Sequence, residues 1–199
     1  CCMDKDQRKM TVTLFENGYQ VDCSSHNVMG QLAEVQSQID VATEQRPLRY
    51  GVEPVTLVAV SKRQPENKID AALEAGQRGF GENRVQEAIQ RWTDRRMAYS
   101  DLTLHLIGPL QTNKVADAVA LFDVIEVVDR ERLARAIAKE MAHQNRFLPC
   151  YIQVNTGEEP QKSGIWPDQL NDFTQFCIGE LGLPIIGLMC IPPVDEEAA

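Results

Sequence analysis

Two alternating patterns of apolar residues run along the chain from Pro54 onward. Short runs rich in β-branched residues predict buried strands, and apolar residues that return every three or four positions predict amphipathic helices between them. The predicted strands cover 55–61, 79–82, 102–108, 124–128, 150–154 and 185–191. The predicted helices cover 66–75, 84–92, 113–121, 130–143 and 167–181, and a further helix over 28–42 precedes the first strand.

This alternation favours a parallel sheet with helices on its outside. An open doubly wound sheet and a closed (β/α)8 barrel both satisfy it. The first strand is not followed by a GxGxxG or Walker A loop, which disfavours a nucleotide-binding open sheet. We therefore predict an α/β fold of the TIM-type (β/α)8 barrel class, with about six of the eight units present. Residues 27–199 would form this single partial barrel, and residues 1–26, which lack periodicity, would be an irregular or disordered lead-in.

Composition narrows the classes of partner. The formal net charge is −9 and the pI is about 4.9, so nucleic acid and anionic membranes are poor partners. No apolar stretch approaches the length of a membrane span, which is about 18 residues or more. Six cysteines are present without a CxxC pair, which does not support a zinc site and favours a reduced, cytoplasmic protein.

The chemistry of a parallel barrel lies where its strands end. Lys62 follows the apolar run 57–60, and lysine is costly to bury unless it has a task or a partner. It could attack an aldehyde there, or it could simply emerge into solvent as the strand ends. On the residues alone, the second interpretation is the stronger one.

Other strand ends carry further polar residues. Asn83 suits a helix N-cap, His105 could be a satisfied core histidine or a pocket donor, and Asn155 begins a long polar loop. Met189 lies in the sixth strand. The arginines between Arg91 and Arg96 are typical of a solvated helix end. These features do not by themselves identify a reaction.

Five motifs occur in order along the chain: AVSK at 59–62, FGENRVQE at 80–87, HLIGPLQTNK at 105–114, QVN at 153–155 with KSG at 162–164, and GLMCIP at 187–192. Together they closely resemble the YggS/PROSC family of pyridoxal phosphate (PLP) homeostasis proteins, from about Val28 to Pro193. One departure is Leu104 and Leu106 beside the histidine, where the family usually has aromatic residues.

The resemblance implies a barrel like the N-terminal domain of alanine racemase (fold type III). It implies PLP held by Lys62 as a Schiff base, with Asn83, His105, Asn155 and Met189 as pocket neighbours. It further implies a role in PLP supply and amino-acid balance without established catalytic turnover. We expect a monomer whose partner is the small-molecule cofactor.

Two alternative functions stay open. A PLP enzyme of the racemase or decarboxylase type resembles this barrel but adds a β-domain that contributes a catalytic tyrosine. A cofactor-free aldolase would use Lys62 on a carbonyl substrate, and the five motifs argue against it.

Family members continue beyond the sixth strand with segments that hold the phosphate and face the pyridine nitrogen. Residues 1–199 contain neither segment, so we expect a fragment of a longer barrel that has an open sheet edge and retains PLP weakly.

Overall fold

Six parallel strands form the centre of the protein, whose computed structural model describes residues 2–3, 10–13, 28–47 and 54–192. They are β3 (Val55–Val60), β4 (Gly79–Glu82), β5 (Thr103–Leu106), β6 (Val124–Val128), β7 (Cys150–Val154) and β8 (Ile185–Cys190). Each strand pairs with the next in chain order. The predicted α/β partial barrel with six βα units is therefore confirmed.

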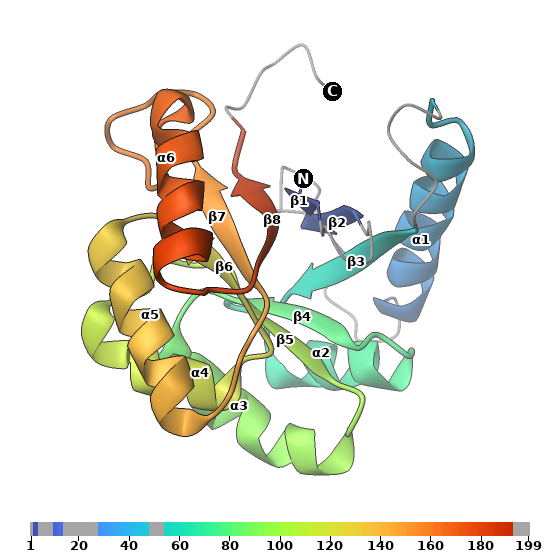
Figure 1. Cartoon of the computed structure of the whole chain (residues 1–199). Coiled ribbons are helices and arrows are strands. Elements are labelled where there is room, and N and C mark those ends of the chain that lie inside the picture. Colours follow the sequence, from blue (N-terminus) through green and yellow to red (C-terminus); the bar gives the residue numbers. More distant parts are fainter. Residues whose placement is uncertain (1, 4–9, 14–27, 48–53, 193–199) are drawn as a thin grey trace.

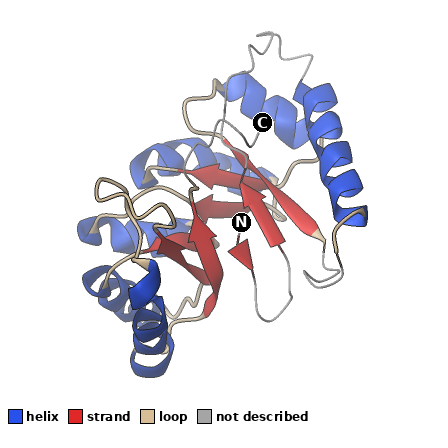
Figure 2. Cartoon of the chain, turned by 90° about the horizontal axis from the view of Figure 1, so that it is seen from above, coloured by secondary structure: helices blue, strands red, loops and turns tan. Residues whose placement is uncertain are grey.

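The helices that follow the strands lie on the outer face of the sheet (Figures 1 and 2). They are α2 (Glu66–Glu74), α3 (Val85–Ala98), η3 (Thr112–Lys114) with α4 (Val115–Leu121), α5 (Glu131–Gln144), and η4 (Pro167–Gln169) with α6 (Leu170–Gln175) and η5 (Phe176–Glu180). The helices cover the outer face, and every residue of β6 and of β7 is buried. The two strands anchor the core under the helices.

The N-terminal part of the chain differs from its prediction. We expected no regular structure in residues 1–26, but β1 (Cys2–Met3) pairs antiparallel with β2 (Met10–Thr13). Strand β2 pairs in parallel with β3, and β1 lies beside β8. The edge of the sheet at β3 is therefore covered by β2. The other residues of the predicted lead-in lie outside the described residues.

Helix α1 (Val28–Glu44) confirms the predicted helix before the first strand and packs on α2 and β3. Helix α3 corrects two expectations. Its N-cap is Arg84 rather than Asn83, and it continues six residues beyond Trp92, to Ala98.

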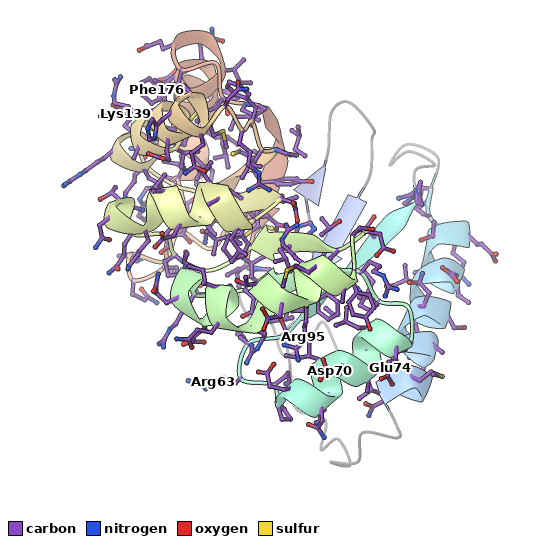
Figure 3. All side chains as sticks on the ribbon, turned by 90° about the horizontal axis from the view of Figure 1, so that it is seen from below. Arg63, Asp70, Glu74, Arg95, Lys139 and Phe176 are labelled. Carbon is purple, nitrogen blue, oxygen red and sulfur yellow. The ribbon has the colours of Figure 1, made fainter. Side chains whose placement is uncertain are left out.

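The predicted solvated helix end between Arg91 and Arg96 is wrong. The side chains of Arg91, Arg95 and Arg96 are only 13%, 18% and 28% exposed, because each pairs with acids of neighbouring elements. Figure 3 shows Arg95 of α3 beside Asp70 of α2. These ion pairs cover one face of the last two turns of the helix, while Thr93, Asp94 and Met97 on the rest of its surface are exposed.

Candidate functional site

Lys62 lies in a tight turn at the carboxyl end of β3. The strand ends at Val60, the amide of Gln64 donates to the carbonyl oxygen of Ser61 at 3.1 Å, and Arg63 has a left-handed φ of 59°. Lys62 itself is half-buried. The fold therefore keeps this lysine at the carboxyl ends of the strands, where the functional groups of a parallel barrel lie.

A cavity of about 320 Å³ opens at the carboxyl ends of the strands. Its lining comes from the ends of five different strands and the segments that follow them: Lys62, Asn83, Ile107, Gly108, Pro109, Gln153, Val154, Asn155, Lys162, Ser163 and Ile191. The volume lies at the lower end of the range of small-molecule sites, about 300 to 1,000 Å³. Three of the five predicted site residues, Lys62, Asn83 and Asn155, thus line one cavity.

The two asparagines of the cavity differ in how their polar atoms are satisfied. Asn155 is held by the loop after β7: its Nδ2 donates to the carbonyl oxygen of Glu159 at 2.8 Å, and its Oδ1 accepts from the Glu159 amide at 3.2 Å. The Oδ1 atom of Asn83 is buried and has no hydrogen-bond partner in the structure. Because an unsatisfied buried acceptor is costly, this oxygen is a candidate to receive a donor from a ligand.

Backbone packs tightly around the cavity at two glycines. A Cβ atom at Gly108 would lie 2.4 Å from the carbonyl oxygen of Asn83. At Gly164, where φ is +125°, it would lie 2.6 Å from the amide nitrogen of Asn155. Larger residues at these positions would displace the two asparagine-bearing segments, so the glycines set the shape of the cavity.

His105 and Met189 do not line this cavity. The Nδ1 atom of His105 lies 2.6 Å from Oε1 of Glu126, and both residues are buried. Met189 is buried in β8, where it pairs in register with Gln153, a residue of the cavity lining. Neither His105 nor Met189 therefore belongs to the lining.

Three further polar residues line the cavity, Gln153, Lys162 and Ser163, which the predicted set of site residues did not include. All three belong to the polar segment at the end of β7 and in the loop after it, and the QVN and KSG motifs of that segment were the signal for them. Gln153 donates to the Ser163 carbonyl oxygen at 3.3 Å, and Lys162 pairs with Glu159 at 2.6 Å. These contacts fold the loop back over the strand end and bring a second amine to the cavity.

A second cavity, of about 300 Å³, lies between α1, β3 and α2; it is mainly apolar and holds Lys68 but not Lys62. Among the described residues, no group of three or more His, Cys, Asp or Glu side chains could hold a metal ion. Within the same residues, no helix is both long and apolar enough to cross a bilayer.

Comparisons with known proteins agree with the barrel fold. The family model described as alanine racemase, N-terminal domain, matches residues 32–199. A histidine racemase from Leuconostoc mesenteroides, 12% identical with a TM-score of 0.56 over 87% of this chain and 39% of that one, shares the fold. The chain therefore belongs to the class of alanine racemase N-terminal-domain barrels.

Within that class the similarity is more specific. The chain is 36% identical over 168 residues to the pyridoxal phosphate homeostasis protein of Pasteurella multocida (84% of this chain, 71% of the relative), and 35% identical over 176 residues to that of Escherichia coli K12 (86% and 73%). The solved structure of PipY from Synechococcus elongatus without PLP is 36% identical, with a TM-score of 0.71 over 84% of this chain and 72% of that one. The PLP-bound form of PipY has a TM-score of 0.68 over the same shares. The chain is a member of the family of pyridoxal phosphate homeostasis proteins, also called YggS/PROSC.

Proposed function

We propose that this protein binds pyridoxal 5'-phosphate through Lys62 and takes part in PLP homeostasis and amino-acid balance. The observation that carries the proposal is the position of Lys62 in a cavity formed by five strand ends, in a chain similar to proteins named for that role. PLP supplies an aldehyde, which condenses with a lysine amine to form a Schiff base with loss of one water.

The residues of the cavity fit such a molecule. Ile107, Pro109, Val154 and Ile191 give apolar walls for a flat ring. The buried Oδ1 of Asn83 would accept a hydrogen bond from a ring substituent, because it has no partner in the protein. Lysine, asparagine and apolar side chains together make a pocket that orients a polar aromatic aldehyde.

The other predicted residues would contribute less directly. Asn155 has both polar groups of its side chain engaged by Glu159, so we propose that it shapes the loop and presents its remaining hydrogen-bonding capacity to the ligand. Met189 would support Gln153 from the neighbouring strand, and His105 would keep the wall rigid through Glu126.

We further propose that the bound PLP is carried as a monomer's cofactor without catalytic turnover. Support comes from the names of the relatives, which describe homeostasis proteins rather than racemases. The similarity to a histidine racemase concerns the fold alone, at 12% identity. Racemisation of free amino acids by the PLP-loaded protein would contradict this part of the proposal.

The binding proposal is tested by adding PLP in large excess, reducing with borohydride, and mapping the labelled lysines by mass spectrometry. We expect the label on Lys62 and its loss in Lys62→Ala, together with the absorbance band of the bound cofactor. Lys68→Ala is the matched control, because Lys68 lines the other cavity, and it should leave the label unchanged. A reducible label that is absent from Lys62 in the unsubstituted protein would refute the proposal.

A further inference from the structure

A buried ionic cluster lies behind the turn that carries Lys62. The carboxylate of Glu82 is fully buried, and its Oε1 accepts hydrogen bonds from Ser61 Oγ at 2.7 Å, Arg91 Nη1 at 2.9 Å and Trp92 Nε1 at 2.9 Å. A charge buried in this way is weak support for stability by itself, since desolvation offsets much of the Coulombic gain. The role of this cluster is therefore better judged from the groups that it holds in place.

The guanidinium of Arg91 also contacts the backbone on both sides of Lys62. Nη1 donates to the Ser61 carbonyl oxygen at 2.9 Å, and Nη2 donates to the Gln64 carbonyl oxygen at 3.3 Å. A guanidinium is planar and rigid, so two donors from one group keep the two carbonyl oxygens at a set separation. The left-handed residue, Arg63, lies between them.

Arg91 keeps its positive charge although it is largely buried. Burial alone would lower the pKa of Arg91, but hydrogen bonds and charges from Glu82 and Glu66 outweigh it and raise that pKa above its ordinary value. Glu66 responds in the opposite sense: burial would raise its pKa, but Arg91 and Arg95 lower it. Arg91 and Glu66 are therefore both charged near neutral pH.

We propose that Arg91 is a positioning residue which, with Glu82 as its buried counter-ion, holds the Ser61–Gln64 turn and so keeps Lys62 directed at the cavity. The inference rests on the proposed role of Lys62 and adds a residue outside the cavity lining. Arg91 touches neither the cavity nor, on this proposal, the cofactor. Its effect passes through the backbone of the turn.

The test compares Arg91→Met with Arg95→Met. Arg95 lies one turn further along α3 and pairs with Glu66 and Asp70. Its hydrogen bonds go to Asp70, Glu66 and the Arg91 carbonyl oxygen and not to the 61–64 turn, so its loss removes charge from the same cluster without releasing the backbone of Lys62. Two readouts are used: native-state hydrogen exchange of the Gln64 amide without PLP, and the rate of borohydride-trapped PLP labelling of Lys62.

We expect Arg91→Met to speed exchange of the Gln64 amide and to slow the labelling of Lys62, each by about tenfold, the size expected for losing hydrogen bonds from a charged donor. Arg91→Lys should recover part of both effects, because it keeps the charge and one donor but not the fork. Arg95→Met should change neither, although it also lowers the melting temperature. If Arg91→Met does not fold, Arg91→Lys carries the same comparison.

Equal Gln64 exchange in the Arg91 and Arg95 variants would overturn the positioning role. Unaltered labelling of Lys62 alongside faster exchange would overturn it as well, since the turn would then not govern the amine. Failure of the PLP proposal itself would give a different result. The unsubstituted protein would then show no label on Lys62, while the Gln64 exchange would still report whether Arg91 holds the turn.

Discussion

Glu82 and Asn83 are adjacent at the end of β4, and their buried side-chain oxygens differ in hydrogen bonding, although Oε2 of Glu82 also lacks a donor. Oε1 of Glu82 receives three donors and belongs to the scaffold behind Lys62. Oδ1 of Asn83, the next residue, is buried without a donor and belongs to a residue that lines the cavity. Leaving such an acceptor unpaired costs about 1 to 3 kcal/mol, which a ligand donor would recover. Glu82 therefore contacts the turn that carries Lys62, while the next residue, Asn83, lines the cavity.

The buried thiols give a prediction at the same scale. Cys150 and Cys177 are both fully buried; burial raises the pKa of the Cys150 thiol well above its usual range and raises that of Cys177 to about 12, with a further contribution from Glu131 at Cys177. Because the thiolate is the reactive form, neither thiol should react with iodoacetamide in the folded protein at pH 8. Peptide mapping after alkylation, with and without urea, measures this. Native alkylation of either residue at its denatured rate would show that the core opens.

At the scale of the elements, the loops after β4 and β5 pack closely against each other at a glycine. Gly108 admits the backbone of Asn83 at a distance that no side chain would allow. This contact ties the start of α3 to the end of β5, next to Lys62. The cavity wall therefore depends on two loops fitting each other and not only on the side chains that face the ligand.

Gly108→Ala tests this dependence. We expect a loss of about 1 to 3 kcal/mol in the free energy of unfolding, the usual cost of overpacking, together with reduced PLP labelling of Lys62. Urea denaturation and borohydride trapping give the two values.

The control for that variant is Gly76→Ala. Gly76 has a φ of +93° and open space around its Cβ position, so alanine there costs backbone strain of about 1 to 2 kcal/mol. It ends α2, away from the cavity, and should leave the labelling of Lys62 intact. Equal labelling in both variants would mean that the contact between the two loops does not shape the site.

At the scale of the whole molecule, the six-stranded parallel sheet would have an open edge at β3 if β2 were absent, and another chain could extend it there. Strand β2 covers it with four residue pairs, Met10 to Thr13 opposite Val55 to Val58. Exposed edge strands promote self-association, because their backbone groups pair with any extended segment. The N-terminal strand pair therefore protects the sheet of this chain.

Thr11→Pro should remove that protection, because Thr11 pairs with Cys2 on one side and Thr56 on the other, and proline cannot donate to a ladder. We expect larger species in analytical ultracentrifugation at concentrations where Thr11→Val, which keeps a β-branched residue, stays at its original size. A proline variant that sediments like the valine variant would show that β2 does not guard this edge.

The alternation of apolar runs by itself determined the six βα units, because each buried strand must be continuously apolar and each outer helix must show one apolar face. The same pattern located the strand ends, and the ordered motifs singled out Lys62 and Asn83. The helix boundary at Trp92 was wrong because the arginines beyond it read as exposed when their acidic partners, Glu66, Asp70 and Asp123, lie far away along the chain.

Only the tertiary structure decided which polar residues share an environment. His105 meets Glu126 from the next strand, and Arg91 reaches the carbonyl oxygens of Ser61 and Gln64, about thirty residues earlier. Burial and pairing depend on such long-range contacts, which local periodicity does not encode. The sequence thus placed Lys62 at the end of a strand, and the folded chain supplied both the cavity in front of it and the arginine that holds its turn from behind.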